Sequence, residues 1–132
     1  MALALVGLIT INSLFAHSPA GIGLQAAAVA LMAWARVTFG HRSFHAGADP
    51  TSGGLVTTGP YRFIRHPIYT AALLFGWTGV LSNWSPRAAG LGVLLTVGAL
   101  VRMLCEERLV VERYPEYREY SRTTKRVVPY LF

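Results

Sequence analysis

The sequence has few charged residues and only one cysteine. Asp, Glu, Lys and Arg make up 14% of its 132 residues, against about 25% in an ordinary soluble domain. The single cysteine, Cys105, excludes an internal disulfide and a metal site built from cysteines. At 53% hydrophobic residues the chain is too apolar to be disordered, and it is too short for two ordinary domains. We therefore expect one folded unit over residues 1–132.

Four apolar stretches fill about half of the chain. They cover residues 2–16, 20–35, 68–84 and 88–105. Each is close to the roughly 20 residues that a helix needs to cross a bilayer, and so many in a short chain cannot all be hidden in a soluble core. We expect an all-α polytopic membrane protein with four transmembrane helices and a short cytoplasmic C-terminal helical tail. Residues 1–45 would form an N-terminal helical hairpin, and residues 53–129 a second hairpin with the tail.

Acidic residues are scarce, and the basic residues are unevenly placed. Six Asp and Glu stand against twelve Lys and Arg, which gives a net charge of +6. All the Lys and Arg residues except Arg87 lie between residues 36 and 66 or from residue 102 onwards. Because cytoplasmic flanks of membrane proteins collect Lys and Arg, we place both termini in the cytoplasm. The tail carries nearly as many Glu as Lys and Arg, so we expect no nucleic-acid partner.

Polar residues suited to chemistry gather in two blocks, and the first precedes the third apolar stretch. Pro67 suits the first turn of a helix, whose N-terminus offers free N–H groups and a positive dipole. Arg62, Arg65 and His66 precede it. This positive environment suits a carboxylate or a phosphate. A basic flank that contacts lipid phosphate is the simpler alternative, but the tyrosines at fixed spacing around it favour a site.

The second block begins at Arg102, near the end of the fourth apolar stretch. Arg102 and Glu106 are four residues apart and share one helix face, and Glu107 lies beside them. A carboxylate near hydrocarbon is costly unless it is paired or faces a polar cavity. A solvated helix leaving the membrane is the alternative, and we accept it for the later glutamates. We expect Glu106 and Glu107 to face a site.

Together the two blocks resemble a known family. They contain R-H-P-x-Y at residues 65–69, R-x-x-x-E-E at 102–107, Y-x-x-Y at 117–120 and a basic-V-x-P tail at 126–129. This ordered set resembles the isoprenylcysteine carboxyl methyltransferase family and its relatives among the phospholipid N-methyltransferases and bacterial integral-membrane methyltransferases. The resemblance covers about residues 53–129. It departs at Ala71, where family members often have Gly.

The resemblance implies a membrane enzyme that transfers a methyl group from S-adenosylmethionine. It assigns eight residues to the cofactor site: His66, Pro67, Tyr69, Glu106, Glu107, Tyr117, Tyr120 and Arg126. The residues that we expect to act in catalysis are Glu107, Arg102 and Arg65. Methyl transfer from a sulfonium is an in-line displacement, so alignment and exclusion of water would provide most of the rate.

The implied acceptor is a lipid-like or small hydrophobic molecule, with membrane lipid around the protein. We favour a carboxylate of the prenylcysteine type, which is already ionised and needs only a positive group such as Arg62, Arg65 or Arg102. A phospholipid amine or a small thiol would need a base, for which Glu107 or His66 is a candidate. A non-enzymatic membrane scaffold that uses the same basic flanks for lipid headgroups is the alternative from another class.

Two other kinds of site are not expected. His41 and His45 are four residues apart, with Asp49 following, but no further ligand stands at a recognisable spacing, so we predict no metal. No G-x-G-x-x-G pattern follows a strand-like segment, which argues against a soluble, Rossmann-like methyltransferase.

Overall fold

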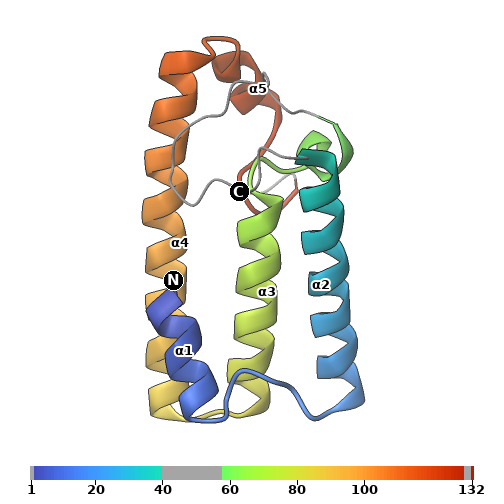
Figure 1. Ribbon diagram of the computed structural model, residues 1–132, viewed down its shortest axis with the longest axis vertical. Helices are drawn as coiled ribbons and strands as arrows, with labels where there is room; N and C mark the ends of the chain where they lie inside the picture. Colours follow the sequence, from blue (N-terminus) through green and yellow to red (C-terminus); the bar gives the residue numbers. More distant parts are fainter. Residues whose placement is uncertain (1, 40–57, 130–131) are drawn as a thin grey trace.

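The computed structural model describes residues 2–39, 58–129 and 132. These residues form five α-helices and one 3₁₀ turn, and none of them forms a strand. The elements are α1 (Ala2–Thr10), α2 (Pro19–Phe39), η2 (Gly59–Arg62), α3 (Pro67–Ser82), α4 (Pro86–Arg113) and α5 (Tyr117–Thr123). The predicted all-α class is confirmed for this part of the chain (Figure 1).

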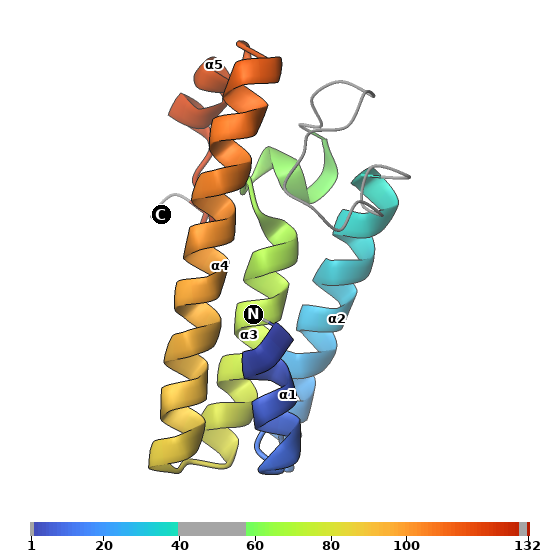
Figure 2. The same cartoon turned by 60° about the vertical axis from the view of Figure 1, so that its left-hand side comes forward.

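Helix α3 is the centre of the bundle. It packs against α2 on one side and α4 on the other, and α1 lies against α4 and α3 (Figure 1). Figure 2 shows that α1 runs along only half of the bundle, on the side of the α3–α4 turn. The central place of α3 agrees with its sequence, which is apolar on all sides.

Proline marks the start of the three long helices. Pro19, Pro67 and Pro86 are the first residues of α2, α3 and α4, where the missing N–H of proline costs nothing. Ser85 caps α4, since its hydroxyl accepts a hydrogen bond of 3.0 Å from the amide of Ala88. The short connection between α3 and α4 therefore makes them antiparallel neighbours, as predicted.

Two of the described helices, and not four, are long and apolar enough to cross a membrane. They are α2, over Pro19–Thr38, and α4. The first apolar stretch falls short because its helix ends at Thr10 after nine residues, and Asn12 takes a left-handed φ of 56° that no continuing helix allows. Helix α3 has 16 residues, fewer than the roughly 20 that span the hydrocarbon. The predicted count of four spans is corrected accordingly.

The segment after α1 returns along α3 and is fixed there by Gln25. The side chain of Gln25 accepts a hydrogen bond of 2.9 Å from the amide of Ala16 and donates to the carbonyls of Leu14, at 2.8 Å, and Phe75, at 3.1 Å. Gly79 of α3 allows this approach, because a Cβ atom there would overlap the Leu14 carbonyl. The connection from α1 to α2, over residues 11–18, is thus longer than a tight turn.

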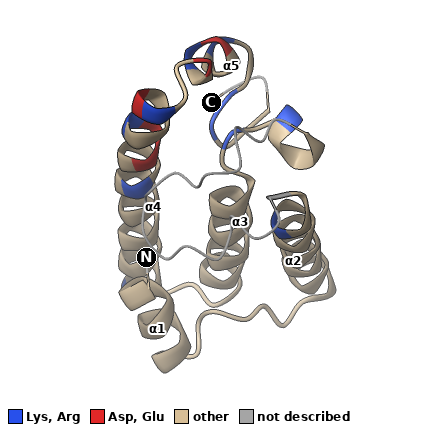
Figure 3. Ribbon diagram, turned by 45° about the horizontal axis from the view of Figure 1, so that its top comes forward, with Lys and Arg blue, Asp and Glu red and all other residues tan. Residues whose placement is uncertain are grey.

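The outside of the bundle is apolar and one end is charged. Large side chains such as Leu3, Val37 and Val97 are exposed, and a surface of this kind is stable in lipid but prone to aggregate in water. Within the described residues, all charged side chains except Arg87 lie toward the end where α2 and α4 finish (Figure 3). Together with the two long apolar helices, this arrangement supports association with a membrane.

Candidate functional site

The carboxylate of Glu107 is the centre of the charged end. His66 Nε2 lies 2.9 Å and Arg65 Nη1 3.0 Å from its Oε1, and Arg126 Nε lies 3.1 Å from its Oε2. The Tyr117 hydroxyl is 3.5 Å from Oε1. With a side chain that is only 11% exposed, Glu107 would be costly to bury without these partners. It therefore joins the start of α3, the C-terminal half of α4 and the tail.

The side chain of Arg65 is buried but incompletely paired. It is 8% exposed, and its guanidinium carbon lies 5.7 Å from the centre of the Tyr117 ring. Its Nη1 contacts Glu107, whereas its Nε has no hydrogen-bond partner. Buried donors are nearly always satisfied in folded proteins, so the unsatisfied Nε of Arg65 is an exception within the charged cluster.

The tail is held to the start of α3 by backbone hydrogen bonds. The amide of Arg65 donates to the carbonyl of Lys125 at 2.7 Å, and the amide of His66 donates to the carbonyl of Arg126 at 2.9 Å. The sequence predicted free N–H groups in the first turn of the helix that begins at Pro67. The amides of Arg65 and His66 lie just before that turn and bind the tail, so they are not available to a ligand while the tail is docked.

Tyr69, Glu106 and Arg102 form a second cluster beside the first. The Tyr69 hydroxyl donates to Glu106 Oε1 and accepts a hydrogen bond of 2.9 Å from Arg102 Nε. Arg102 Nη2 also lies 3.8 Å from Glu106 Oε1. The rings of His66 and Tyr69 are 5.8 Å apart, which places the two clusters side by side. Unlike Glu107, Glu106 is partly open to solvent.

Two further residues, which the sequence did not assign to the site, hydrogen-bond its segments to one another. The Thr70 hydroxyl lies 2.9 Å from the carbonyl of Val127 and so links α3 to the tail. The carbonyl of the buried Tyr61 accepts a hydrogen bond from the Tyr120 hydroxyl. Spacing within a helix cannot reveal such contacts, because each joins residues more than fifty positions apart.

Burial raises the pKa of the tyrosines around the clusters. Burial, followed by the charge of Glu107, raises the pKa of Tyr117 from 10.0 to about 12. Burial also raises the pKa of Tyr61, with a further contribution from Glu106, and that of Tyr120, with a further contribution from Tyr117. These phenols are therefore neutral hydrogen-bond donors at physiological pH.

All the sequence-predicted site residues lie at this end of the bundle. They are Arg65, His66, Pro67, Tyr69, Arg102, Glu106, Glu107, Tyr117, Tyr120 and Arg126. Pro67 is buried and contributes the first turn of α3. Their roles toward a cofactor or an acceptor remain predictions.

No candidate metal site is found among the described residues of the charged end. His41, His45 and Asp49 lie outside the described residues. Within the described ranges, no group of three or more His, Cys, Asp or Glu is placed to hold a metal ion.

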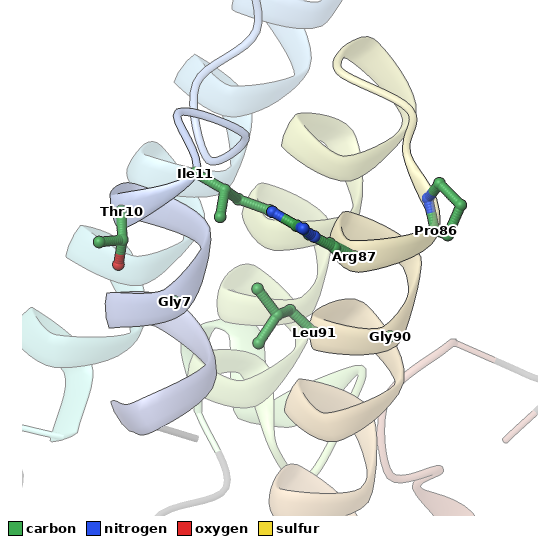
Figure 4. A pocket seen from close by; sticks show the side chains of 7 residues that line it. All are labelled: Gly7, Thr10, Ile11, Pro86, Arg87, Gly90 and Leu91. Atoms are coloured by element: carbon green, nitrogen blue, oxygen red, sulfur yellow. The ribbon is translucent and has the colours of Figure 1, made fainter.

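An open groove lies at the opposite end, where α1 meets the start of α4 (Figure 4). It is lined by Gly7, Thr10, Ile11, Pro86, Arg87, Gly90 and Leu91. None of the predicted site residues reaches it. The groove is therefore separate from the clusters around Glu107 and Glu106.

Comparison with known proteins connects these residues to a family. The chain is 35% identical over 80 residues to the cobalt-zinc-cadmium resistance protein CzcN of Cupriavidus metallidurans, a match that covers 58% of this chain and 36% of that protein. The chain thus spans about a third of the length of that relative. No solved structure matches significantly. The family model described as phospholipid methyltransferase matches residues 16–117, more than three quarters of the sequence. The chain therefore belongs to the phospholipid methyltransferase family of membrane methyltransferases.

Proposed function

We propose that this protein transfers a methyl group from S-adenosylmethionine to a carboxylate on a lipid-like molecule. One observation carries the proposal: the His66–Glu107–Arg126 and Tyr69–Glu106–Arg102 clusters lie together at the charged end of an apolar bundle. The family supports methyl transfer in a membrane. The family resemblance implies the cofactor, and the chemistry of the clusters supports it and guides the choice of acceptor.

The charged and aromatic side chains of the clusters fit S-adenosylmethionine. This cofactor carries a sulfonium, an ammonium and a carboxylate, and when bound it supplies an electrophilic methyl group. Glu106, with the Tyr69 ring beside it, suits the cationic groups. The unpartnered Nε of Arg65 suits the carboxylate. His66, Pro67, Tyr117, Tyr120 and Arg126 would shape the remaining walls.

Glu107 acts in this proposal as a positioning residue. Both of its carboxylate oxygens already face Arg65, His66 or Arg126, so it is poorly placed to accept a proton from a substrate. Its function would be to fix these three side chains around the cofactor. An acceptor that needs no base agrees with this arrangement.

The excess of cations favours an ionised carboxylate as the acceptor. Arg65, Arg102 and Arg126 stand against the two carboxylates of Glu106 and Glu107. Arg102 is partly exposed and would orient the acceptor carboxylate from the membrane boundary. A lipid-like acceptor fits the apolar outer faces of α2 and α4. The residues would accelerate the reaction by alignment and by exclusion of water.

A phospholipid amine is the second candidate acceptor, because the matched family is named for phospholipid methylation. An amine or a thiol must lose a proton, and His66, hydrogen-bonded to Glu107, would be the base. The charged end would face the cytoplasm in either case, since it holds nearly all the Lys and Arg. We propose that α3 shares the membrane with its neighbours α2 and α4. The cytoplasmic placement of the N-terminus stays a prediction, because α1 has nine residues and runs along only the half of the bundle away from the charged end (Figure 2).

The test supplies methyl-labelled S-adenosylmethionine to the purified, reconstituted protein with three acceptors. These are an S-prenylated cysteine with a free carboxylate, phosphatidylethanolamine and a hydrophobic thiol. We expect label in the base-labile ester of the first, and strong loss of it in Arg102→Gln but not in Arg108→Gln, which changes an exposed Arg of the same helix. Label only in the amine or the thiol would overturn the carboxylate assignment. Label in none of the three would contradict the proposed activity.

A further inference from the structure

The end of α2 and the η2 turn form a cationic face, on which the described residues include no Asp or Glu. Arg36 and Arg62 are both exposed there. The described glutamates lie only on α4, on α5 and in the short link between them, which Figure 3 shows as a separate red and blue region. The two sides of the charged end thus differ. The side of α4 and α5 carries charges of both signs, whereas the charged residues described at the end of α2 and in η2 are all basic.

This cationic face lies where the apolar part of α2 ends. The candidate span of α2 finishes at Thr38, and η2 packs on that end of the helix. The contact is close, because a Cβ atom on Gly59 would lie 2.6 Å from the Thr38 hydroxyl. Arg62 in η2 and Arg36 in α2 are therefore held at the level where hydrocarbon gives way to headgroups.

Exposed aromatic rings accompany the two arginines. Phe63 is 44% exposed, and the guanidinium carbon of Arg62 lies 5.3 Å from the centre of its ring. Trp34, two positions before Arg36, is 49% exposed. Two positions apart on a helix, Trp34 and Arg36 point to different sides of α2 but lie at the same level. Exposed Trp and Arg at one level are typical of a membrane interface, where the ring lies among acyl chains and the cation reaches a phosphate.

We propose that Arg36, Arg62 and Phe63 form a docking surface for the headgroups of anionic phospholipids, with Trp34 at the same level on another side of α2. The two guanidinium groups would bind phosphate, and the two rings would lie between the upper acyl chains. A dissolved anion would gain nothing from the rings. This surface is distinct from the Glu107 and Glu106 clusters, and its test does not depend on methyl transfer.

The experiment measures which lipids collect around the full-length protein in phosphatidylcholine vesicles. Trace spin-labelled phosphatidylglycerol or phosphatidylcholine is added, and the immobilised fraction of each is compared. We expect phosphatidylglycerol to be enriched over phosphatidylcholine. Arg36→Gln with Arg62→Gln should lower that selectivity about fivefold or more, since each arginine near a membrane surface contributes on this scale. Arg118→Gln with Arg122→Gln on α5, matched in charge and exposed, should keep most of it.

Several outcomes would overturn the proposal. They are equal retention of both lipids by the parent protein, equal loss of selectivity in the two double variants, and abolition of the enrichment by millimolar inorganic phosphate, which would indicate a site for a free anion. Arg36→Lys with Arg62→Lys guards against misfolding, because it keeps both charges. Selectivity retained in this variant supports the surface, whereas its loss with intact helical circular dichroism counts against a charge-based surface.

Discussion

His66 and Glu107 form a buried hydrogen bond of 2.9 Å across 41 residues of sequence. His66 immediately precedes α3, and Glu107 lies in the C-terminal part of α4. Arg126 brings the tail to the same carboxylate. The Glu107 carboxylate therefore connects three segments that carry the family motifs. It is the group whose loss would disturb the site most.

Replacing Glu107 by Gln should loosen the tail and abolish cofactor binding. The substitution leaves Arg65, buried beside the carboxylate, without its ion-pair partner, and breaking such a buried pair costs about 3 kcal/mol or more. We expect a lower midpoint of thermal unfolding and faster proteolysis after residue 113, with the helical circular dichroism of the bundle retained.

Glu112→Gln is the matched control, because Glu112 lies on the same helix and is exposed. Lys125→Ala should also have little effect, since Lys125 holds α3 through its backbone carbonyl and its side chain is exposed. Glu107→Gln behaving like Glu112→Gln in both assays would contradict the central place of Glu107.

Thr70→Val tests the hydroxyl that links α3 to the tail and also lies 3.1 Å from the carbonyl of His66. It keeps the shape of the side chain but removes the hydroxyl that contacts the Val127 carbonyl at 2.9 Å. We expect a loss of about 1 kcal/mol in the stability of the docked tail, measured as faster amide exchange of the Arg65 and His66 backbone N–H groups. Unchanged exchange at these amides would show that the hydroxyl contributes nothing.

The sequence could predict the site better than the membrane spans. His66, Glu107 and Arg126 stand in motifs whose order is specific, so their convergence could be expected before the fold was known. The break after Thr10 was less visible, because Asn12 and Ser13 are the only strongly polar residues within an apolar run. Asn12 takes the left-handed conformation of a helix C-cap, where its amide donates to Ile9 and that of Ser13 donates to Leu8. The burial of Arg65 could not be foreseen either, since it results from the tail folding back over α3.

Alkaline pH should unfold the charged end. Because burial and Glu107 raise the pKa of Tyr117 from 10.0 in the unfolded chain to about 12, the folded state is favoured fully below pH 10. This stabilisation is lost as the pH rises from 10 to 12. Burial acts in the same direction on Tyr61 and Tyr120. We expect tyrosinate absorbance and loss of tail protection to rise together, and a smaller alkaline loss in Tyr117→Phe. Ionisation of all six tyrosines near pH 10 with the tail still docked would contradict this.

Gly79→Ala and Gly90→Ala should have opposite effects. A Cβ atom at residue 79 would overlap the Leu14 carbonyl, whereas at residue 90 it would meet nothing within 4 Å. The first variant should displace the segment after α1 and lower the unfolding midpoint in detergent. The second should be neutral or stabilising by up to about 1 kcal/mol, because Ala favours a helix over Gly. Equal midpoints for the two variants would refute the packing of residues 13–16 against α3.

The most direct test of the proposed activity is calorimetric titration of the detergent-solubilised protein with S-adenosylmethionine and S-adenosylhomocysteine. We predict binding at one site per chain, lost in His66→Ala and Glu107→Gln and kept in Glu112→Gln. No binding by a helical, folded sample, with or without a prenylated carboxylate acceptor, would contradict the assignment of the charged end as a cofactor site.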